Sequence, residues 1–182
     1  MIYGGTMEQD IDKSYFKEKI TKQNPTIFDV GTFDGSDCLD FLKLYESPNI
    51  YAFEADKRSI DIFNKYVGDK PINLIETALS NVDGEIEFYQ SESETRRHTR
   101  YDYEKTWSAS GSVKKPGSHL EIFPDIQFEL NKVKSTKLDT WMLGKNIDLI
   151  DIMWVDVNGG EEEFLDGGKN TINNKVNYLY IE

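Results

Sequence analysis

Several residue types are scarce in this chain of 182 residues, and each scarcity excludes a class of protein. A single cysteine, Cys38, excludes an internal disulfide framework and favours a reducing compartment, so we expect a cytoplasmic protein. The two histidines, His98 and His119, stand 21 residues apart, which is not a metal-ligand spacing, and we expect no metal. No apolar run reaches transmembrane length, and the first residues lack the apolar core of a signal peptide. We therefore expect no membrane association.

Basic residues are also scarce relative to acidic ones. Lys and Arg together number 21, against 33 for Asp and Glu, which gives a formal charge of −12. A general nucleic-acid binder needs positive surface to meet the phosphates. We therefore expect no general nucleic-acid binding, unless a local basic patch supplies it.

Short apolar stretches alternate with amphipathic ones along the chain. This pattern predicts strands at 26–30, 49–55, 72–79, 85–90, 147–157 and 176–182, and helices at 37–45, 57–70 and 161–172. Such alternation predicts one α/β domain over 1–182, with a mainly parallel twisted sheet covered by helices on both faces and an N-terminal helical segment over 1–25. Ligands of these folds bind beyond the carboxyl ends of the strands, where Asp29, Glu54, Thr77 and Asp156 fall.

The glycine-containing turn in "IFDVGTFDGSDCLDFL" (27–42) is the first candidate ligand site. Gly31 and Gly35 allow a sharp turn and a close approach of the backbone to a ligand. Their G-x-x-x-G spacing differs from the G-x-G-x-x-G of dinucleotide folds. The turn carries Asp34 and Asp37 and no Lys or Arg, so a pyrophosphate would lack a cation there. The positive sulfonium and ammonium groups of S-adenosylmethionine would be attracted instead.

Glu54 supports an adenosine ligand without choosing between cofactors. It stands 19 residues beyond Gly35, at the end of the second expected strand, where a carboxylate can accept bonds from ribose hydroxyls. NAD-binding proteins share this feature, and the acidic turn favours S-adenosylmethionine. Taken alone, the turn is better explained as a plain strand–helix connection; together with Glu54 and the strand alternation, it favours a ligand site.

A set of short motifs follows in a fixed order along the chain. They are D-V-G-x-x-x-G over 29–35, F-E-x-D over 53–56, A-L-S-x-x-x-G over 78–84, L-D at 138–139, D-V-N-G-G-E over 156–161 with a later glycine at 167, and I-E at 181–182. Over residues 26–182 this ordered set resembles the FkbM-type S-adenosylmethionine-dependent methyltransferases. The resemblance implies a Rossmann-like class I methyltransferase fold and O-methylation of a hydroxyl on a sugar or small metabolite.

The resemblance also implies roles for individual residues. The methionine end of the cofactor would lie by the first motif, the ribose by Glu54 and the adenine by the residues after it. The expected cofactor contacts are Asp29, Gly31, Thr32, Phe33, Gly35, Ser36, Glu54, Ala55, Asp56, Thr77 and Ala78. Asp156 would lie beside the transferable methyl group as the first catalytic candidate, with His119 as a distant second. For Asp156 the alternative is a helix N-cap, because three glutamates follow at 161–163.

The chain departs from the family pattern in two places. Asn158 stands where the family usually has Glu, which removes a carboxylate from the fourth-strand motif. The last two strands of the fold also have no counterpart, so the strand at 176–182 would present an apolar edge. We expect a second subunit of a homo-oligomer, the N-terminal segment or further chain to cover that edge.

The long segment 90–137 is expected to be an insertion or an acceptor-binding lid. Residues 96–115 contain six Lys or Arg against two acidic residues, with aromatic residues interleaved. Such a segment suits an acceptor that carries a phosphate or carboxylate. The expected acceptor contacts are Arg96, Arg97, Trp107 and Ser110. A solvated insertion without function explains the composition equally well.

Two other functions stay open at this point. An NAD-linked oxidoreductase would share the fold, although the glycine spacing and the acidic turn disfavour it. A non-catalytic cofactor-binding or scaffold protein of the same fold is made more plausible by Asn158 in the fourth-strand motif and by the missing counterpart of the last two strands.

Overall fold

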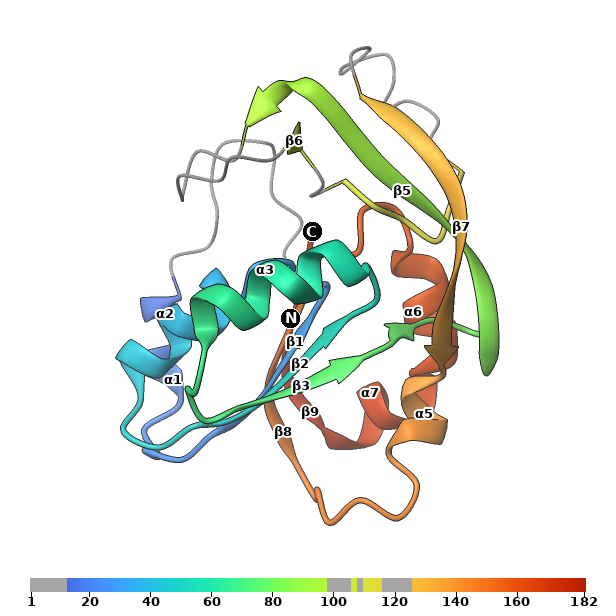
Figure 1. Cartoon of the computed structure of the whole chain (residues 1–182). Coiled ribbons are helices and arrows are strands. Elements are labelled where there is room, and N and C mark those ends of the chain that lie inside the picture. The colour runs from blue at the N-terminus through green and yellow to red at the C-terminus, as the bar shows by residue number, and fades with distance from the viewer. Residues whose placement is uncertain (1–12, 98–105, 108–109, 116–125) are drawn as a thin grey trace.

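A central sheet of five parallel strands organises the molecule, in the order β3-β2-β1-β8-β9 (Figure 1). In this computed structural model residues 13–97, 106–107, 110–115 and 126–182 are described, with the backbone alone for 93–97 and 106–107. The five strands are β1 (Thr26–Val30), β2 (Asn49–Glu54), β3 (Ile72–Glu76), β8 (Ile150–Val155) and β9 (Val176–Ile181). The predicted parallel α/β sheet is thus confirmed, and the carboxyl ends of β1, β2 and β8 meet at one rim.

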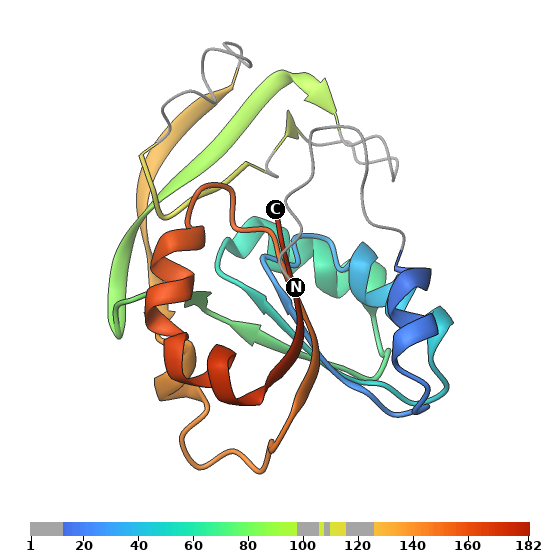
Figure 2. The ribbon, with the colours of Figure 1, turned by 180° about the vertical axis from the view of Figure 1, so that it is seen from behind.

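Helices cover both faces of this sheet (Figures 1 and 2). One face carries α1 (Ser14–Lys19), α2 (Ser36–Leu44) and α3 (Lys57–Val67), whose apolar side chains pack on Ile27, Ile50 and Ile152. The other face carries α5 (Leu138–Trp141), α6 (Glu161–Gly167) and α7 (Lys169–Lys175), which pack on Phe28, Phe53 and Met153. The apolar stretches therefore pack as two layers of core, one on each side of the sheet.

The helix predicted at 161–172 is two helices, α6 and α7, separated at Gly168. Asp139 explains the break, because its carboxylate accepts the backbone N–H groups of Asn170 (3.0 Å) and Thr171 (2.7 Å) at the start of α7. Burial raises the pKa of Asp139, but these hydrogen bonds outweigh burial and hold it below its ordinary value. The L-D pair at 138–139 thus has a capping role in the structure.

A second, smaller sheet follows the order β4-β7-β5-β6. Its strands are β4 (Ala78–Leu79), β5 (Gly84–Arg97), β6 (Thr106–Trp107) and β7 (Gln127–Thr136). The strand predicted at 72–79 divides between the two sheets. The segment 90–137, expected to be an insertion or an acceptor lid, contains the later part of β5 and all of β7. Residues 84–92 of β5 pair with residues 127–135 of β7 as an antiparallel ribbon.

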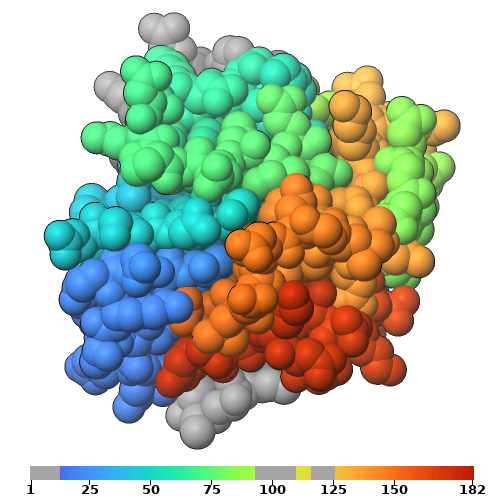
Figure 3. Space-filling view, turned by 90° about the horizontal axis from the view of Figure 1, so that it is seen from below, coloured from blue at the N-terminus to red at the C-terminus, as the bar shows by residue number. Residues whose placement is uncertain are grey.

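β9 lies at the edge of the five-stranded sheet. Phe16 of α1 packs against Tyr178, with ring centroids 6.1 Å apart, and Trp154 of β8 stacks on Tyr180 at 3.9 Å. From below, the surface of the N-terminal residues (blue) borders that of the C-terminal elements (orange and red) (Figure 3). The N-terminal helix therefore covers one face of β9. That a second subunit or further chain covers the edge of β9 stays a prediction. Among the described helices, none combines the length and apolar character needed to span a membrane.

Candidate functional site

A pocket opens at the rim where the central strands end. Its walls come from the β1–α2 turn, the end of β2, the β3–β4 turn, β5, residues 110–115 and the turn after β8. The described lining residues are Val30, Gly31, Phe33, Phe53, Glu54, Ala55, Asp56, Ser59, Thr77, Ala78, Leu79, Phe88, Gly111, Val113, Asp156, Val157 and Asn158. The structure thus brings together eight of the residues expected in a site: Gly31, Phe33, Glu54, Ala55, Asp56, Thr77, Ala78 and Asp156.

Gly31 is required by a close approach of two backbones. Its φ is +82°, and a Cβ there would stand 1.8 Å from the carbonyl oxygen of Asp156. The N–H groups of Gly31 and Thr32 both donate to the carbonyl of Phe53, at 3.0 and 3.1 Å. The β1–α2 turn is therefore held between the ends of β2 and β8, at the floor of the pocket.

Gly35 serves packing between helices and does not line the pocket. It precedes α2 with φ +77°, and a Cβ there would stand 2.4 Å from Val67 and 2.7 Å from the Phe63 ring of α3. Ser36 starts α2, and its N–H donates to Asp34 at 2.9 Å. The two glycines of the G-x-x-x-G motif therefore have different roles. Gly31 allows the backbone to contact that of Asp156, and Gly35 allows the start of α2 to pack against α3.

Glu54 is the best-organised polar group of the site. Its Oε1 accepts the N–H groups of Ala55 (2.7 Å) and Asp56 (2.8 Å), and its Oε2 accepts the N–H of Phe33 (2.9 Å), a residue held at φ +50°. Burial raises the pKa of Glu54 to about 7, although these three hydrogen bonds lower it. The carboxyl group is therefore fixed in place before any ligand arrives.

The charges of the glycine turn are arranged differently from the sequence-based expectation. That expectation rested on a turn without a cation, yet the ammonium of Lys13 lies 2.7 Å from Asp37 and 4.3 Å from the centroid of the Trp154 ring. Lys13 precedes α1 and reaches the turn only through tertiary packing, so the motif could not reveal it. The expectation that no cation lies beside the acidic residues of the turn was therefore wrong.

Asp29 points into the protein and is absent from the pocket lining. It is 1% exposed, and it accepts the hydroxyl of Thr32 at 2.6 Å and the thiol of Cys38 at 2.9 Å. Burial, aided by the charge of Asp37, raises the pKa of Asp29 to about 7. Cys38 is fully buried, and burial raises the pKa of its thiol well above the ordinary value. Cys38 therefore serves packing in the core.

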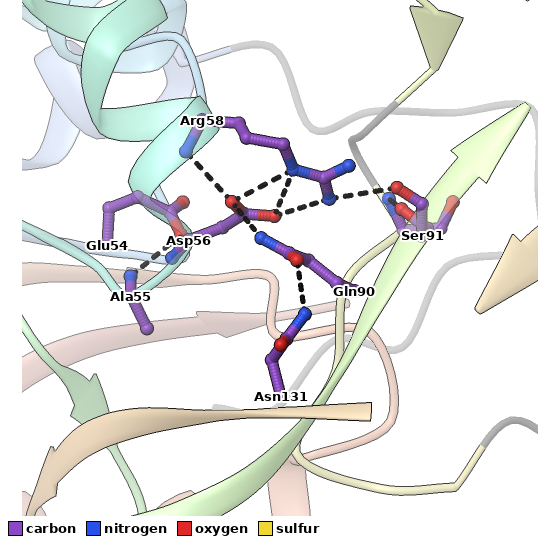
Figure 4. A network of polar contacts seen from close by, with 8 residues as sticks. Glu54, Ala55, Asp56, Arg58, Gln90, Ser91 and Asn131 are labelled. Atoms are coloured by element: carbon purple, nitrogen blue, oxygen red, sulfur yellow. Dashed lines mark hydrogen bonds and ion pairs between the residues drawn. The ribbon is translucent and has the colours of Figure 1, made fainter. Parts of the chain in front are cut away.

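The negative character of the pocket comes from other carboxyl groups. Glu54, Asp56 and Asp156 are in the described lining, and that lining contains no Lys, Arg or His. Asp56 also caps α3 and is bound by Arg58 and Gln90, at 2.7 and 2.8 Å (Figure 4). An acidic site at this rim is thus present, with partly different residues from those first considered.

Asp156 follows β8 directly and faces the pocket next to Asn158. Its backbone N–H donates to Val30 at 3.0 Å, which ties the end of β8 to β1. Burial, aided by the nearby charge of Glu182, raises the pKa of Asp156 to about 7. The N-cap alternative does not hold, because the residue preceding α6 is Gly160 and no side chain caps that helix. Asn158 itself adopts φ +51° and lines the pocket.

The expected acceptor contacts are only partly described. Arg96 and Arg97 end β5 and Trp107 belongs to β6, where the backbone alone is described. Ser110 is buried and does not line the pocket; its N–H donates to Ser91 at 3.0 Å. His119, like His98, lies outside the described residues. Sequence reasoning missed the lining residues Phe88, Gly111 and Val113. Phe88 lies in β5, and the bridge between Tyr89 and Ser112 brings Gly111 and Val113 beside that strand.

Comparison with known proteins gives one family and one curated relative. The family model described as the methyltransferase FkbM domain matches residues 29–182. The 2-O-methyltransferase NoeI of Sinorhizobium fredii (strain NBRC 101917 / NGR234) is 32% identical over 165 residues, which cover 90% of this chain and 65% of NoeI. The chain thus spans slightly less than two thirds of that relative's length. No solved structure matches the chain. The resemblance drawn from the ordered motifs is confirmed, and the chain belongs to the FkbM methyltransferase family.

Proposed function

We propose that this protein transfers a methyl group from S-adenosylmethionine to a hydroxyl oxygen of a sugar or small metabolite. The observation that carries the proposal is the acidic pocket at the strand ends, where Glu54 and Asp156 stand on opposite sides of Gly31 in the central sheet. Membership of the FkbM methyltransferase family supports the same reaction class.

The chemistry of the described lining supports S-adenosylmethionine as the cofactor. A carboxylate offers about four acceptor positions, and three backbone N–H groups already use Glu54, so about one remains for a ribose hydroxyl. Phe53, Leu79 and Phe88 supply apolar surface for a flat adenine ring. The carboxyl groups favour a positively charged ligand. The described lining has no basic side chain that could bind a diphosphate. When bound, the cofactor supplies an electrophilic methyl group carried on a positive sulfur.

Asp156 is the residue that we assign to the acceptor. A methyl transfer depends mainly on alignment of the two reacting groups, and a base that takes the hydroxyl proton adds to it. The Asp156 carboxylate accepts that proton and orients the acceptor oxygen. A pKa of about 7 leaves the group able both to accept and to release a proton near neutral pH.

The printed name of the relative suggests which acceptor to test first. NoeI is described as a 2-O-methyltransferase, so we propose a sugar hydroxyl next to the anomeric carbon as the first acceptor class. The sugar could be neutral, or it could carry a phosphate or carboxylate that binds the basic residues of 96–115.

A methyl-transfer assay tests this function. Protein, methyl-labelled S-adenosylmethionine and a panel of sugars are incubated, and each sugar is paired with its 2-deoxy analogue. We expect label on at least one sugar and none on its 2-deoxy partner. Cofactor binding without transfer to any acceptor would support the non-catalytic alternative that Asn158 raises. Reduction of NAD by a hydroxylated substrate would support the oxidoreductase.

A further inference from the structure

Residues 110–115, here called the strap, form the wall of the pocket that faces Asp156 and Asn158. Gly111 and Val113 line the pocket. A Cβ on Gly111 would stand 2.6 Å from the Phe88 ring, and a Cβ on Gly160 would stand 2.8 Å from Val113. The strap is therefore packed tightly between β5 and the turn that begins α6.

Backbone and side-chain hydrogen bonds fasten the strap to β5. Ser112 and Tyr89 exchange two backbone hydrogen bonds, at 2.7 and 3.1 Å. The N–H of Ser110 donates to the hydroxyl of Ser91 at 3.0 Å, and Ser91 is fully buried. At the other end, the Lys114 ammonium lies 2.9 Å from Glu162, a residue whose side chain is 87% exposed. Because exposed ion pairs contribute little, the buried attachment to β5 dominates.

Arg58 holds the segment of β5 from which the strap is fastened (Figure 4). Its Nη2 donates to the carboxylate of Asp56 at 2.7 Å and to the carbonyl of Ser91 at 2.9 Å. The same carboxylate accepts the side chain of Gln90 at 2.8 Å, and Gln90 in turn accepts that of Asn131 at 2.6 Å. A continuous set of contacts thus runs from the turn after Glu54, through Arg58 and Ser91, to the strap.

We propose that Arg58 is a positioning residue that couples the cofactor-binding turn (54–56) to the strap, and so sets the acceptor side of the pocket. This inference rests on the proposed function. Arg58 is absent from the described pocket lining, so it acts through Ser91 and not on a ligand. Its Nε and Nη2 hold the Asp56 carboxylate, and Nη2 also reaches the Ser91 carbonyl. A lysine side chain is shorter and lacks the planar fork, so its ammonium cannot occupy the Nη2 position.

Two variants test this coupling from its two ends. Arg58→Lys keeps a cation for the buried Asp56 but loses the bond to Ser91. Ser91→Ala keeps the carbonyl for Arg58 but removes the hydroxyl that accepts from Ser110. Lys57→Gln is the matched control, because Lys57 starts the same helix and, among the described residues, forms an ion pair only with Asp61, with both side chains 67% exposed. Thermal unfolding of all three identifies any variant that fails to fold.

Amide hydrogen exchange gives a readout that does not depend on any substrate. Both variants should speed amide exchange at Ser110 and Ser112 by roughly tenfold. Each variant loses one hydrogen bond that fastens the strap, and the loss of one such bond changes an opening equilibrium by about that factor. Arg58→Lys must do so although Arg58 touches neither residue. Unchanged exchange in the strap, or equal acceleration across all strands, would overturn the coupling.

Kinetics then separates the coupling from the proposed function. We expect the KM for the acceptor to rise by roughly tenfold while kcat changes less than about threefold, and Lys57→Gln to behave as the unaltered protein. A fall in kcat with an unchanged KM would overturn the assignment of the strap to the acceptor. If the unaltered protein transfers no methyl group, the proposed function fails, while the exchange experiment still decides the coupling.

Discussion

At the scale of single residues, Gly31 shows how a close contact between two backbone segments requires a glycine. Gly31 and Gly144 both have left-handed φ angles but lie in very different surroundings: Gly31 at +82° lies against the Asp156 carbonyl, and Gly144 at +71° has no atom within 4 Å of an added Cβ. The same substitution at both sites therefore separates two losses of stability: that from the close backbone contact with Asp156, and that from the unfavourable dihedral angle.

We expect Gly31→Ala to lower the free energy of unfolding by about 3–5 kcal/mol, since strain of the dihedral and overpacking both contribute. Gly144→Ala should cost about 1–2 kcal/mol, because only the dihedral contributes. Urea titration followed by circular dichroism measures both. Equal losses at the two glycines would show that the close approach to Asp156 has no energetic weight.

In the proposed function, Asp156 is the residue on which the chemical step depends. Asp156→Asn should lower kcat by about 10²–10⁴-fold, as for loss of a general base, with a far smaller change in cofactor affinity. Because the base must be deprotonated, the transfer rate should rise with pH, reach half its maximum near the pKa of about 7 and then level off. Full turnover by the variant, or a rate independent of pH between 5 and 8, would remove Asp156 from the mechanism.

Sequence reasoning located the residues of the rim but not all of their partners. Gly31, Glu54 and Asp156 were predictable because each follows a buried strand, and parallel strands end together. The Lys13 contact with Asp37 was not, since 24 residues separate the two and no pattern links them. The inward direction of Asp29 was also hidden, because it depends on the side chains of Thr32 in the following turn and Cys38 in α2.

At the scale of elements, α1 supplies the cation that the glycine turn lacks. The Lys13 side chain is 14% exposed, contacts the Asp37 carboxylate and lies over the Trp154 ring. Lys13→Met should lower the free energy of unfolding by about 1–3 kcal/mol, because a partly buried ion pair and a cation–π contact are lost together.

Lys19→Met on the same short helix is the control for this change. Lys19 is exposed and its ammonium lies 5.4 Å from the centroid of the exposed Tyr15 ring, so its substitution should cost less than about 1 kcal/mol. Denaturant titration of both variants gives the comparison. Equal stabilities for the two would mean that the Lys13 contacts do not hold α1 on the sheet.

The ribbon of β5 and β7 is the element that the sequence concealed. β7 (Gln127–Thr136) is mostly exposed or half-buried, and its charged residues face their partners across the ribbon, such as Glu87 opposite Lys132. A strand without a buried apolar face lacks the alternation by which strands are identified. The central strands, whose residues are buried on both faces of the sheet, were predictable for the opposite reason.

At the scale of the whole molecule, buried carboxyl groups make stability depend on pH in an unusual direction. The pKa values of Asp29, Glu54 and Asp156 are each raised to about 7, so the folded protein holds these protons more tightly than the unfolded chain. Their contribution to stability is complete below the ordinary carboxyl pKa and is lost as pH rises through about 7. Carboxyls with lowered pKa values, such as Asp83 and Asp139, are ionised in both states over this window.

We therefore expect the midpoint of thermal unfolding to rise when pH is lowered from about 8 to about 5.5, and repulsion within a chain of formal charge −12 acts in the same direction. Calorimetry across this range at constant ionic strength measures the slope. The double variant Glu54→Gln/Asp156→Asn should flatten the slope. A midpoint that is highest at pH 8 would show that these carboxyls are not buried as described.

Cofactor choice is the central claim, and titration calorimetry with S-adenosylmethionine and NAD tests it most directly. The matched variants are Glu54→Gln and Glu76→Gln, which neutralise neighbouring carboxylates at the ends of β2 and β3, the first in the pocket and the second exposed. We predict that S-adenosylmethionine binds the unaltered protein and Glu76→Gln alike, that it binds Glu54→Gln about tenfold or more weakly, and that NAD gives no binding heat. Tight binding of NAD with no binding of S-adenosylmethionine would contradict the account.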